Sequence, residues 1–107
     1  MAVINANDND FKLQLGKDGI AVVKYYADWC GNCKLFAPKF KRVSNEEEMS
    51  GIRFLDVDAE KNPEARKAAG VDNLPFLAVF KDGVLLEGSA SSKEEYLRAL
   101  IEKAQQQ

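Results

Sequence analysis

The sequence contains no histidine and only two cysteines and three prolines among its 107 residues. The absence of histidine excludes histidine-based acid–base catalysis, Cys–His nucleophile pairs and most patterns of zinc ligands. Two cysteines are too few for a disulfide scaffold in a domain of this size. No apolar run approaches the roughly 20 residues of a membrane-spanning helix. The first ten residues have neither the basic region nor the apolar core of a secretory signal, so we expect a cytoplasmic protein without a membrane association.

The composition is that of an ordinary globular protein, with 46% apolar residues and a net charge of −2. A chain of this length buries roughly two-thirds of its unfolded surface, which is enough for one core. We therefore expect residues 1–107 to form a single domain. The mildly acidic balance argues against nucleic acid as a partner.

Hydrophobic periodicity predicts strands that alternate with helices. Strands are expected at residues 2–5, 20–27, 51–57, 76–80 and 84–87. Helices are expected at residues 7–16, 33–43, 62–70 and 91–104. The early crossovers imply parallel strands, and the "KDG" turn at 81–83 implies an antiparallel hairpin at the end. The fold class is therefore α/β, with a central mixed sheet flanked by helices on both faces.

Capping residues mark where three of these helices begin or end. Asn62 is the expected N-cap of the third helix, with a proline at its first position and a glycine after its end. The last helix is expected to open with a capping box, formed by Ser91 and Glu94 or by Ser92 and Glu95. The first helix is expected to close at one of two nearby glycines, Gly16 or Gly19.

Cys30 and Cys33 lie where the apolar strand 20–27 is followed by a helix. The N-terminus of a helix stabilises a thiolate, which is the nucleophile in disulfide exchange. We expect Cys30 to be the better exposed cysteine and the attacking one, and Cys33 to resolve the mixed disulfide from one turn inside. A metal site would need ligands from carboxylates or a second chain, and two inert buried cysteines are the other alternative. Redox chemistry is the favoured interpretation.

The stretch "YYADWCGNCKLFAP", residues 25–38, resembles the active-site segment of the thioredoxins. The resemblance extends through "NPEARKAAGV" and "DNLPFLAVFKDG" to nearly the whole chain, and Pro75 falls on the family's cis-proline. It implies a thioredoxin fold and a protein-disulfide reductase with a redox-active Cys30–Cys33 disulfide, supplied with electrons by a flavoprotein thioredoxin reductase. We expect no cofactor, no bound metal and a monomeric chain whose substrates are protein disulfides.

The resemblance also implies a substrate-binding surface around the cysteines. Leu74 and Pro75 would lie against the pair, and their backbone would pair with an extended substrate chain. Trp29 would border the attacking sulfur, although a plain core tryptophan is the alternative. Gly31 and Asn32 lie between the two cysteines.

The sequence departs from the family pattern at several positions. Asn32 replaces the usual proline between the cysteines, which affects the redox potential. Phe76 replaces a small polar residue after the cis-proline and would alter substrate preference, and the hairpin between Gly83 and Gly88 is a few residues short. Lys24 stands where thioredoxins carry a buried aspartate.

We predict that Lys24 pairs with Asp56 on the neighbouring strand, counted without gaps back from Gly70, and that the pair lies under Cys33. The resemblance implies a role for this pair in proton transfer, since the family's aspartate has one. The alternative is a Lys24 near a sheet edge, with its amine extended to solvent.

Two other functions stay open at this point. The first is a thioredoxin-like binding module of low turnover that grips its partner at the Leu74–Pro75 surface. The second is a thioredoxin-like protein shifted toward oxidation or isomerisation of disulfides.

Overall fold

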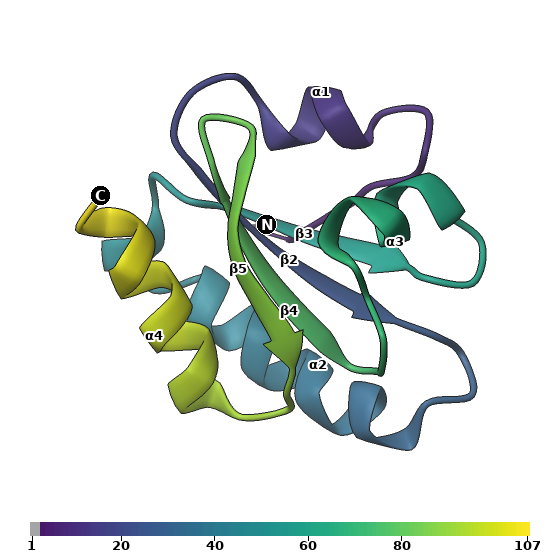
Figure 1. Cartoon of the computed structure of the whole chain (residues 1–107). Coiled ribbons are helices and arrows are strands. Elements are labelled where there is room, and N and C mark those ends of the chain that lie inside the picture. Colours follow the sequence, from purple (N-terminus) through teal and green to yellow (C-terminus); the bar gives the residue numbers. More distant parts are fainter. Residues whose placement is uncertain (1–2) are drawn as a thin grey trace.

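The computed structural model describes residues 3–107, which form a five-stranded mixed sheet in the order β1-β3-β2-β4-β5 (Figure 1). β1 and β2 pair in parallel with β3, whereas β4 is antiparallel to both β2 and β5. The strands are β1 Val3–Asn5, β2 Ile20–Tyr26, β3 Arg53–Asp58, β4 Phe76–Lys81 and β5 Val84–Ala90. The predicted order of elements along the chain, the mixed sheet and the final hairpin are confirmed; the first residue of the predicted strand 2–5 lies outside the described residues.

Helices cover both faces of the sheet, as predicted. α1 and α3 lie on one face, and α2 and α4 lie on the other (Figure 1). The helices are α1 Phe11–Leu15, α2 Gly31–Ser44, α3 Pro63–Ala69 and α4 Glu94–Gln105, with a short 3-10 helix at Glu47–Met49. α2 continues past Pro38 to its end at Ser44. No helix in residues 3–107 is long and apolar enough to cross a membrane.

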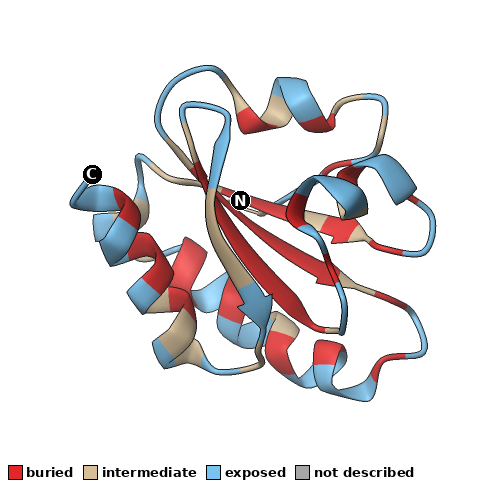
Figure 2. Ribbon diagram, in the orientation of Figure 1, coloured by how far each residue is buried: buried red, intermediate tan, exposed pale blue. Residues whose placement is uncertain are grey.

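The core consists of two layers, one on each side of the sheet, because successive residues of a strand point to opposite faces. Val23 and Tyr25 of β2 pack toward α1 and α3, whereas Val22 packs toward Phe36 and Phe40 of α2. The three inner strands are buried along most of their length (Figure 2). Lys24 points into the same layer as Val22, which places a charge inside an apolar region.

The predicted starts of α1, α2 and α4 are wrong in detail, and α2 begins at Gly31 rather than at residue 33. α1 begins at Phe11 rather than at residue 7, because the Asn7 side chain accepts the backbone N–H groups of Asn9 and Asp10 and forms a turn. The predicted capping boxes of α4 are absent: Lys93 is its N-cap and makes no capping hydrogen bond, while Ser91 Oγ accepts the N–H of Lys93. The C-terminal end of α1 is at Gly16, one of the two predicted glycines.

Asn62 is the N-cap residue of α3, but its side chain does not cap the helix. Asp8 supplies the capping carboxylate, which accepts the N–H groups of Glu64 at 3.2 Å and Ala65 at 2.8 Å. Asn62 instead accepts the N–H of Asp8 at 2.9 Å and so holds the capping residue in place. A capping partner more than fifty residues away leaves no local signal in the sequence.

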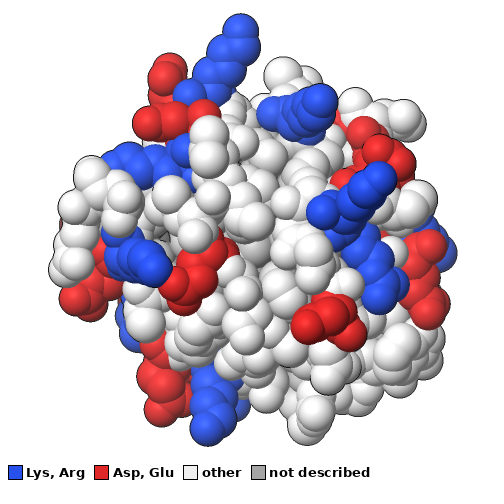
Figure 3. Space-filling view, in the orientation of Figure 1, with Lys and Arg blue, Asp and Glu red and all other residues white. Residues whose placement is uncertain are grey.

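Acidic and basic side chains are interspersed on the surface seen in Figure 3, with uncharged regions between them. Some of the protein's charged side chains form ion pairs, as Arg98 does with Glu46 and with Glu94 of its own helix. This face carries no continuous patch of a single charge sign.

Candidate active site

The two cysteines lie at the start of α2, where the loop after β2 enters the helix. Cys30 is the N-cap residue, and its Sγ accepts the backbone N–H of Cys33 at 3.1 Å. The two sulfurs form a disulfide in this structure. The helix N-terminus and this N–H group both stabilise negative charge on Cys30 once the disulfide is reduced.

We predicted that Cys30 would be clearly better exposed than Cys33, but in the structure both cysteines are buried to nearly the same extent. Cys30 is 5% exposed and Cys33 is 3% exposed, because both pack with Ala27 against Tyr26 and Leu74. What distinguishes them is the polar environment, since the Cys30 sulfur occupies the capping position and receives the N–H group. The helix terminus, rather than exposure, therefore distinguishes Cys30 from Cys33.

Trp29 is 68% exposed, so the alternative of a core tryptophan is wrong. Its indole Nε1 donates a hydrogen bond to Glu60 Oε2 at 2.7 Å. Gly31 and Asn32 are exposed beside it in the first turn of α2. Nothing in the sequence singled out Glu60, which lies in the short loop between β3 and α3.

Leu74 packs against the cysteines and is joined to Pro75 by a cis peptide bond. Two of their backbone groups already have partners: the Leu74 N–H donates to Asn73 Oδ1 at 2.9 Å, and the Pro75 carbonyl accepts the N–H of Ser91 at 3.0 Å. A substrate chain that pairs with the Leu74 N–H therefore has to displace the Asn73 side chain.

Phe76 does not border the cysteines. It is 4% exposed and packs edge-to-face on Tyr25, with ring centroids 6.1 Å apart, in the layer under α1 and α3. Gly88 of β5 leaves room for its ring, because a Cβ there would lie 2.8 Å from Phe76 Cε1. An effect of Phe76 on substrate preference would therefore have to be indirect.

Lys24 and Asp56 form the predicted ion pair. They are opposite each other on β2 and β3, and Lys24 Nζ lies 3.3 Å from Asp56 Oδ1. The side chains are 4% and 21% exposed, so the alternative of a solvent-directed Lys24 is wrong. The Oδ1 atom has no hydrogen bond of good geometry despite its closeness to the ammonium, so the contact is mainly electrostatic.

Two aromatic rings complete the surroundings of the Lys24 ammonium. Nζ lies 5.6 Å from the ring centre of Tyr26 and 5.4 Å from that of Phe40. Aromatic faces attract cations at this distance, and the attraction is larger where water is excluded. The carboxylate and both rings therefore stabilise a positive charge at a buried position.

A cavity of about 210 Å³ connects this pair with Cys33. Lys24, Asp56 and Cys33 line it together with Tyr26, Ala27, Asp28, Lys34 and Ala37. Its volume has room for a few water molecules, each of which takes about 30 Å³ in the liquid. The cavity thus offers a route for a proton between the thiol and the ion pair.

Burial raises the pKa of the Asp56 carboxyl above its ordinary value, and the positive charge of Lys24 opposes this rise. The folded protein therefore binds this proton more tightly than the unfolded chain, whose aspartates titrate near a pKa of about 3.9. The stability that protonated Asp56 contributes is lost as the pH rises from the unfolded pKa through the raised folded pKa.

We expect wild-type protein to lose stability relative to Asp56→Asn as the pH rises from about 3.5 to 7, because only the wild type has this carboxyl to ionise. Urea unfolding of both proteins across this range measures the difference. Above the folded pKa the difference should become constant. A difference that is independent of pH, or that changes in the opposite direction, would contradict the raised pKa of Asp56.

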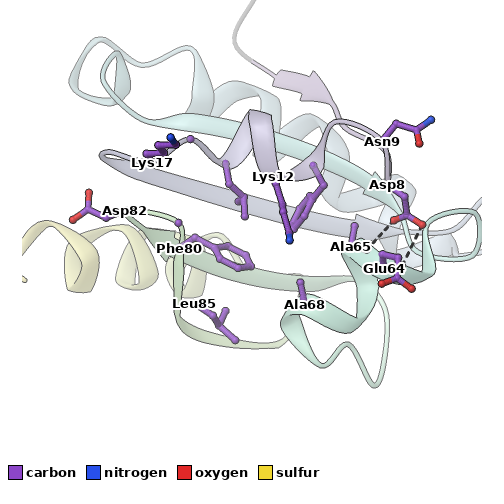
Figure 4. Close-up of a pocket in the computed structure, with 14 residues that line it drawn as sticks. Asp8, Asn9, Lys12, Lys17, Glu64, Ala65, Ala68, Phe80, Asp82 and Leu85 are labelled. Atoms are coloured by element: carbon purple, nitrogen blue, oxygen red, sulfur yellow. Dashed lines mark hydrogen bonds between the residues drawn. The ribbon is translucent and has the colours of Figure 1, made fainter.

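A second, larger hollow lies away from the cysteines, between α1, α3 and the β4–β5 hairpin (Figure 4). Its volume is about 790 Å³, and the edge-to-face pair Phe11 and Phe80 forms part of its wall. Asp8 lines it but caps α3 with its carboxylate. Neither cysteine, nor the Lys24–Asp56 pair, reaches this hollow, so it is not part of the redox site.

A cysteine pair at a helix N-terminus, beside a cis-proline loop and above a buried ion pair, defines a site for thiol–disulfide exchange. The thioredoxin family model matches residues 2–103. Thioredoxin of Bacillus subtilis is 32% identical over 104 residues, which are 96% of this chain and 98% of that protein.

Solved structures agree with this match. The thioredoxin of Malassezia sympodialis has a TM-score of 0.87 at 25% identity, over 97% of this chain and 94% of that one. A thioredoxin f2, solved in complex with ferredoxin:thioredoxin reductase, has a TM-score of 0.86 at 30% identity, over 97% and 96%. The chain belongs to the thioredoxin family and has the thioredoxin fold. It is a thioredoxin-type disulfide reductase, a thiol–disulfide oxidoreductase with a C-x-x-C redox pair.

Proposed function

We propose that Cys30 is the attacking thiolate of this reductase and Cys33 the resolving thiol. The observation that carries this assignment is the hydrogen bond from the Cys33 N–H to Cys30 Sγ at the helix N-terminus. The Cys30 thiolate attacks one sulfur of a substrate disulfide; a Cys30–substrate disulfide forms, and the other substrate sulfur leaves as a thiolate.

The second step releases the reduced substrate. Cys33 loses its proton and attacks the Cys30 sulfur, so that the Cys30–Cys33 disulfide forms and the bond to the substrate breaks. The substrate sulfur leaves as a thiolate and takes up a proton. The substrate thereby gains two electrons and two protons, and the enzyme ends in the disulfide form that this structure contains.

Lys24 and Asp56 assist the second step in this proposal. Asp56 accepts the proton of Cys33 through the cavity that both residues line, and the Lys24 ammonium stabilises the negative charge that develops there. The raised pKa of Asp56 supports this role, because a base works best when its pKa is close to the working pH. The pair thus takes over the function implied for the family's buried aspartate, with the two charges exchanged between strands.

The substrate chain binds along the Leu74–Pro75 loop and beside Trp29. The Leu74 carbonyl and, after Asn73 moves aside, the Leu74 N–H pair with an extended segment of the substrate. The exposed indole of Trp29 forms an apolar wall next to the attacking sulfur. Gly31 and Asn32 leave space for the substrate at the start of α2.

We also propose an electron donor, a cellular location and an oligomeric state for this protein. A thioredoxin reductase restores the Cys30–Cys33 dithiol; the complex of a thioredoxin f2 with ferredoxin:thioredoxin reductase supports this kind of donor. The protein works as a monomer in the cytoplasm. Residues 1–107 act as one domain, which the continuous sheet and its two core layers support.

The reduction potential of the Cys30–Cys33 pair tests the reducing direction. We expect a value between about −300 and −230 mV, around the roughly −270 mV typical of thioredoxins. Trapping of free thiols after equilibration in redox buffers of defined potential measures it, and an Asn32→Pro variant shows how much the residue between the cysteines contributes. A value near about −120 mV, where strongly oxidising members of the fold lie, would contradict the reductase direction.

A further inference from the structure

Trp29 is held in one orientation although most of its side chain is in solvent. The indole is 68% exposed, and an exposed side chain ordinarily samples several rotamers. Here its single polar atom, Nε1, donates to Glu60 Oε2 at 2.7 Å, across 31 positions of sequence. A hydrogen bond to a carboxylate is stronger than one between neutral groups, so this contact can fix the ring.

The loop that carries Glu60 is itself anchored close to the cysteines. Asp58 Oδ1 accepts the N–H of Glu60 at 3.0 Å, which closes a turn at the end of β3. The N–H of Ala59 donates to the carbonyl of Tyr26 at 2.8 Å, at the end of the strand that leads into the site. Asn62 Nδ2 donates to the Asp58 carbonyl at 3.0 Å and closes the loop. The Glu60 carboxylate is therefore presented from a fixed backbone.

We propose that Glu60 is a positioning residue for substrate binding, which acts by holding the Trp29 indole beside Cys30. The inference rests on the proposed role of Trp29 as a wall of the substrate site. Binding of a polypeptide to a side chain that is already ordered avoids the entropy cost of ordering it. Glu60 touches no reacting atom, so the chemical step does not depend on it. Its effect is confined to substrates large enough to contact the indole.

The test compares Glu60→Ala, which removes the acceptor, with Glu60→Gln, which keeps an acceptor oxygen without the charge. Glu48→Ala is the matched control, because Glu48 is an exposed glutamate in the 3-10 helix beyond the other end of α2. Steady-state kinetics are measured with a protein disulfide and with a small symmetric aromatic disulfide. Time-resolved fluorescence anisotropy reports the motion of the indole, since Trp29 is the only tryptophan in the sequence.

For Glu60→Ala we expect KM for the protein disulfide to rise about fivefold, which is the size of one lost hydrogen bond. We expect kcat, and the rate with the small disulfide, to stay within about twofold, and the fast component of the anisotropy decay to grow. Glu60→Gln should lie between Glu60→Ala and the wild type, and Glu48→Ala should match the wild type. Unchanged KM and anisotropy in Glu60→Ala would overturn the inference, as would a Glu60→Gln variant indistinguishable from Glu60→Ala.

A Trp29→Phe variant separates this inference from the proposal on which it rests. If Trp29→Phe raises KM and Glu60→Ala adds nothing in the double variant, the two residues act as one unit, as we expect. If Trp29→Phe raises KM and Glu60→Ala alone does not, only the positioning role of Glu60 is overturned. If Trp29→Phe leaves KM unchanged, the substrate-binding role of Trp29 fails and the inference fails with it.

Discussion

Replacement of either cysteine by serine is expected to reduce turnover with a protein disulfide by about a thousandfold or more. A serine hydroxyl is not ionised near neutral pH and does not exchange with disulfides, so the full cycle, which needs both sulfurs, cannot be completed in any of these variants. The loss should be the same size in Cys30→Ser, in Cys33→Ser and in the double variant, because the two sulfurs act as one unit. The rate of disulfide reduction in the presence of an electron donor measures it.

The double variant Cys30→Ser, Cys33→Ser also distinguishes catalysis from binding. Its substrate surface, formed by Trp29 and the Leu74–Pro75 loop, should stay intact, so it should bind a protein substrate reversibly while it turns over none. Turnover that survives in the double variant would contradict the redox role of the pair.

The second large effect is expected at the buried ion pair. Asp56→Leu leaves the Lys24 ammonium, which is 4% exposed, without its carboxylate, and should cost about 3–5 kcal/mol of unfolding free energy. Lys24→Met should cost less, about 2–3 kcal/mol, because Asp56 is partly exposed and can take up a proton. The double variant should be more stable than the sum of the single losses predicts, since it leaves no buried charge unpaired.

Denaturant unfolding of the four proteins in this cycle measures the coupling. Lys81→Met is a suitable control, because Lys81 is a partly buried strand lysine whose amine donates to main-chain oxygens of Ala104 and Gln107 and, within residues 3–107, to no aspartate or glutamate side chain. The rate of substrate release should fall by at least about tenfold in all three cycle variants, which lack the base, the cation or both. Additive stability losses would show that Lys24 and Asp56 do not act as a pair.

The sheet and its helices could be predicted because the signals were local. The apolar run of β2 has the continuous pattern of a strand covered on both faces, and the spacing of Phe36, Phe40 and Val43 is that of a helix with one buried side. The details of the helix termini could not be predicted in the same way. Asp8 caps α3 across 56 and 57 positions of sequence, and that contact exists only after the chain has folded.

In the redox site, too, the features with local sequence signals could be predicted and those that depend on distant contacts could not. The cysteine pair follows from its spacing at a strand–helix junction, and the pairing of Lys24 with Asp56 follows from the cost of a buried charge. The burial of Cys30 could not be predicted, because it depends on Leu74, which reaches the pair from a distant loop. The partner of Trp29 is likewise fixed by a turn after β3 that has no signature near the tryptophan.

The most direct measurement of the proposed mechanism is the intact mass of each single serine variant after reaction with a protein disulfide. Cys33→Ser keeps the attacking thiolate and lacks the resolving one, so it should accumulate a covalent adduct with the mass of one substrate chain, which a reducing agent releases. Cys30→Ser should accumulate none under the same conditions. A stable adduct on Cys33 in the Cys30→Ser variant, with none in Cys33→Ser, would reverse the two roles and contradict the assignment drawn from the helix N-terminus.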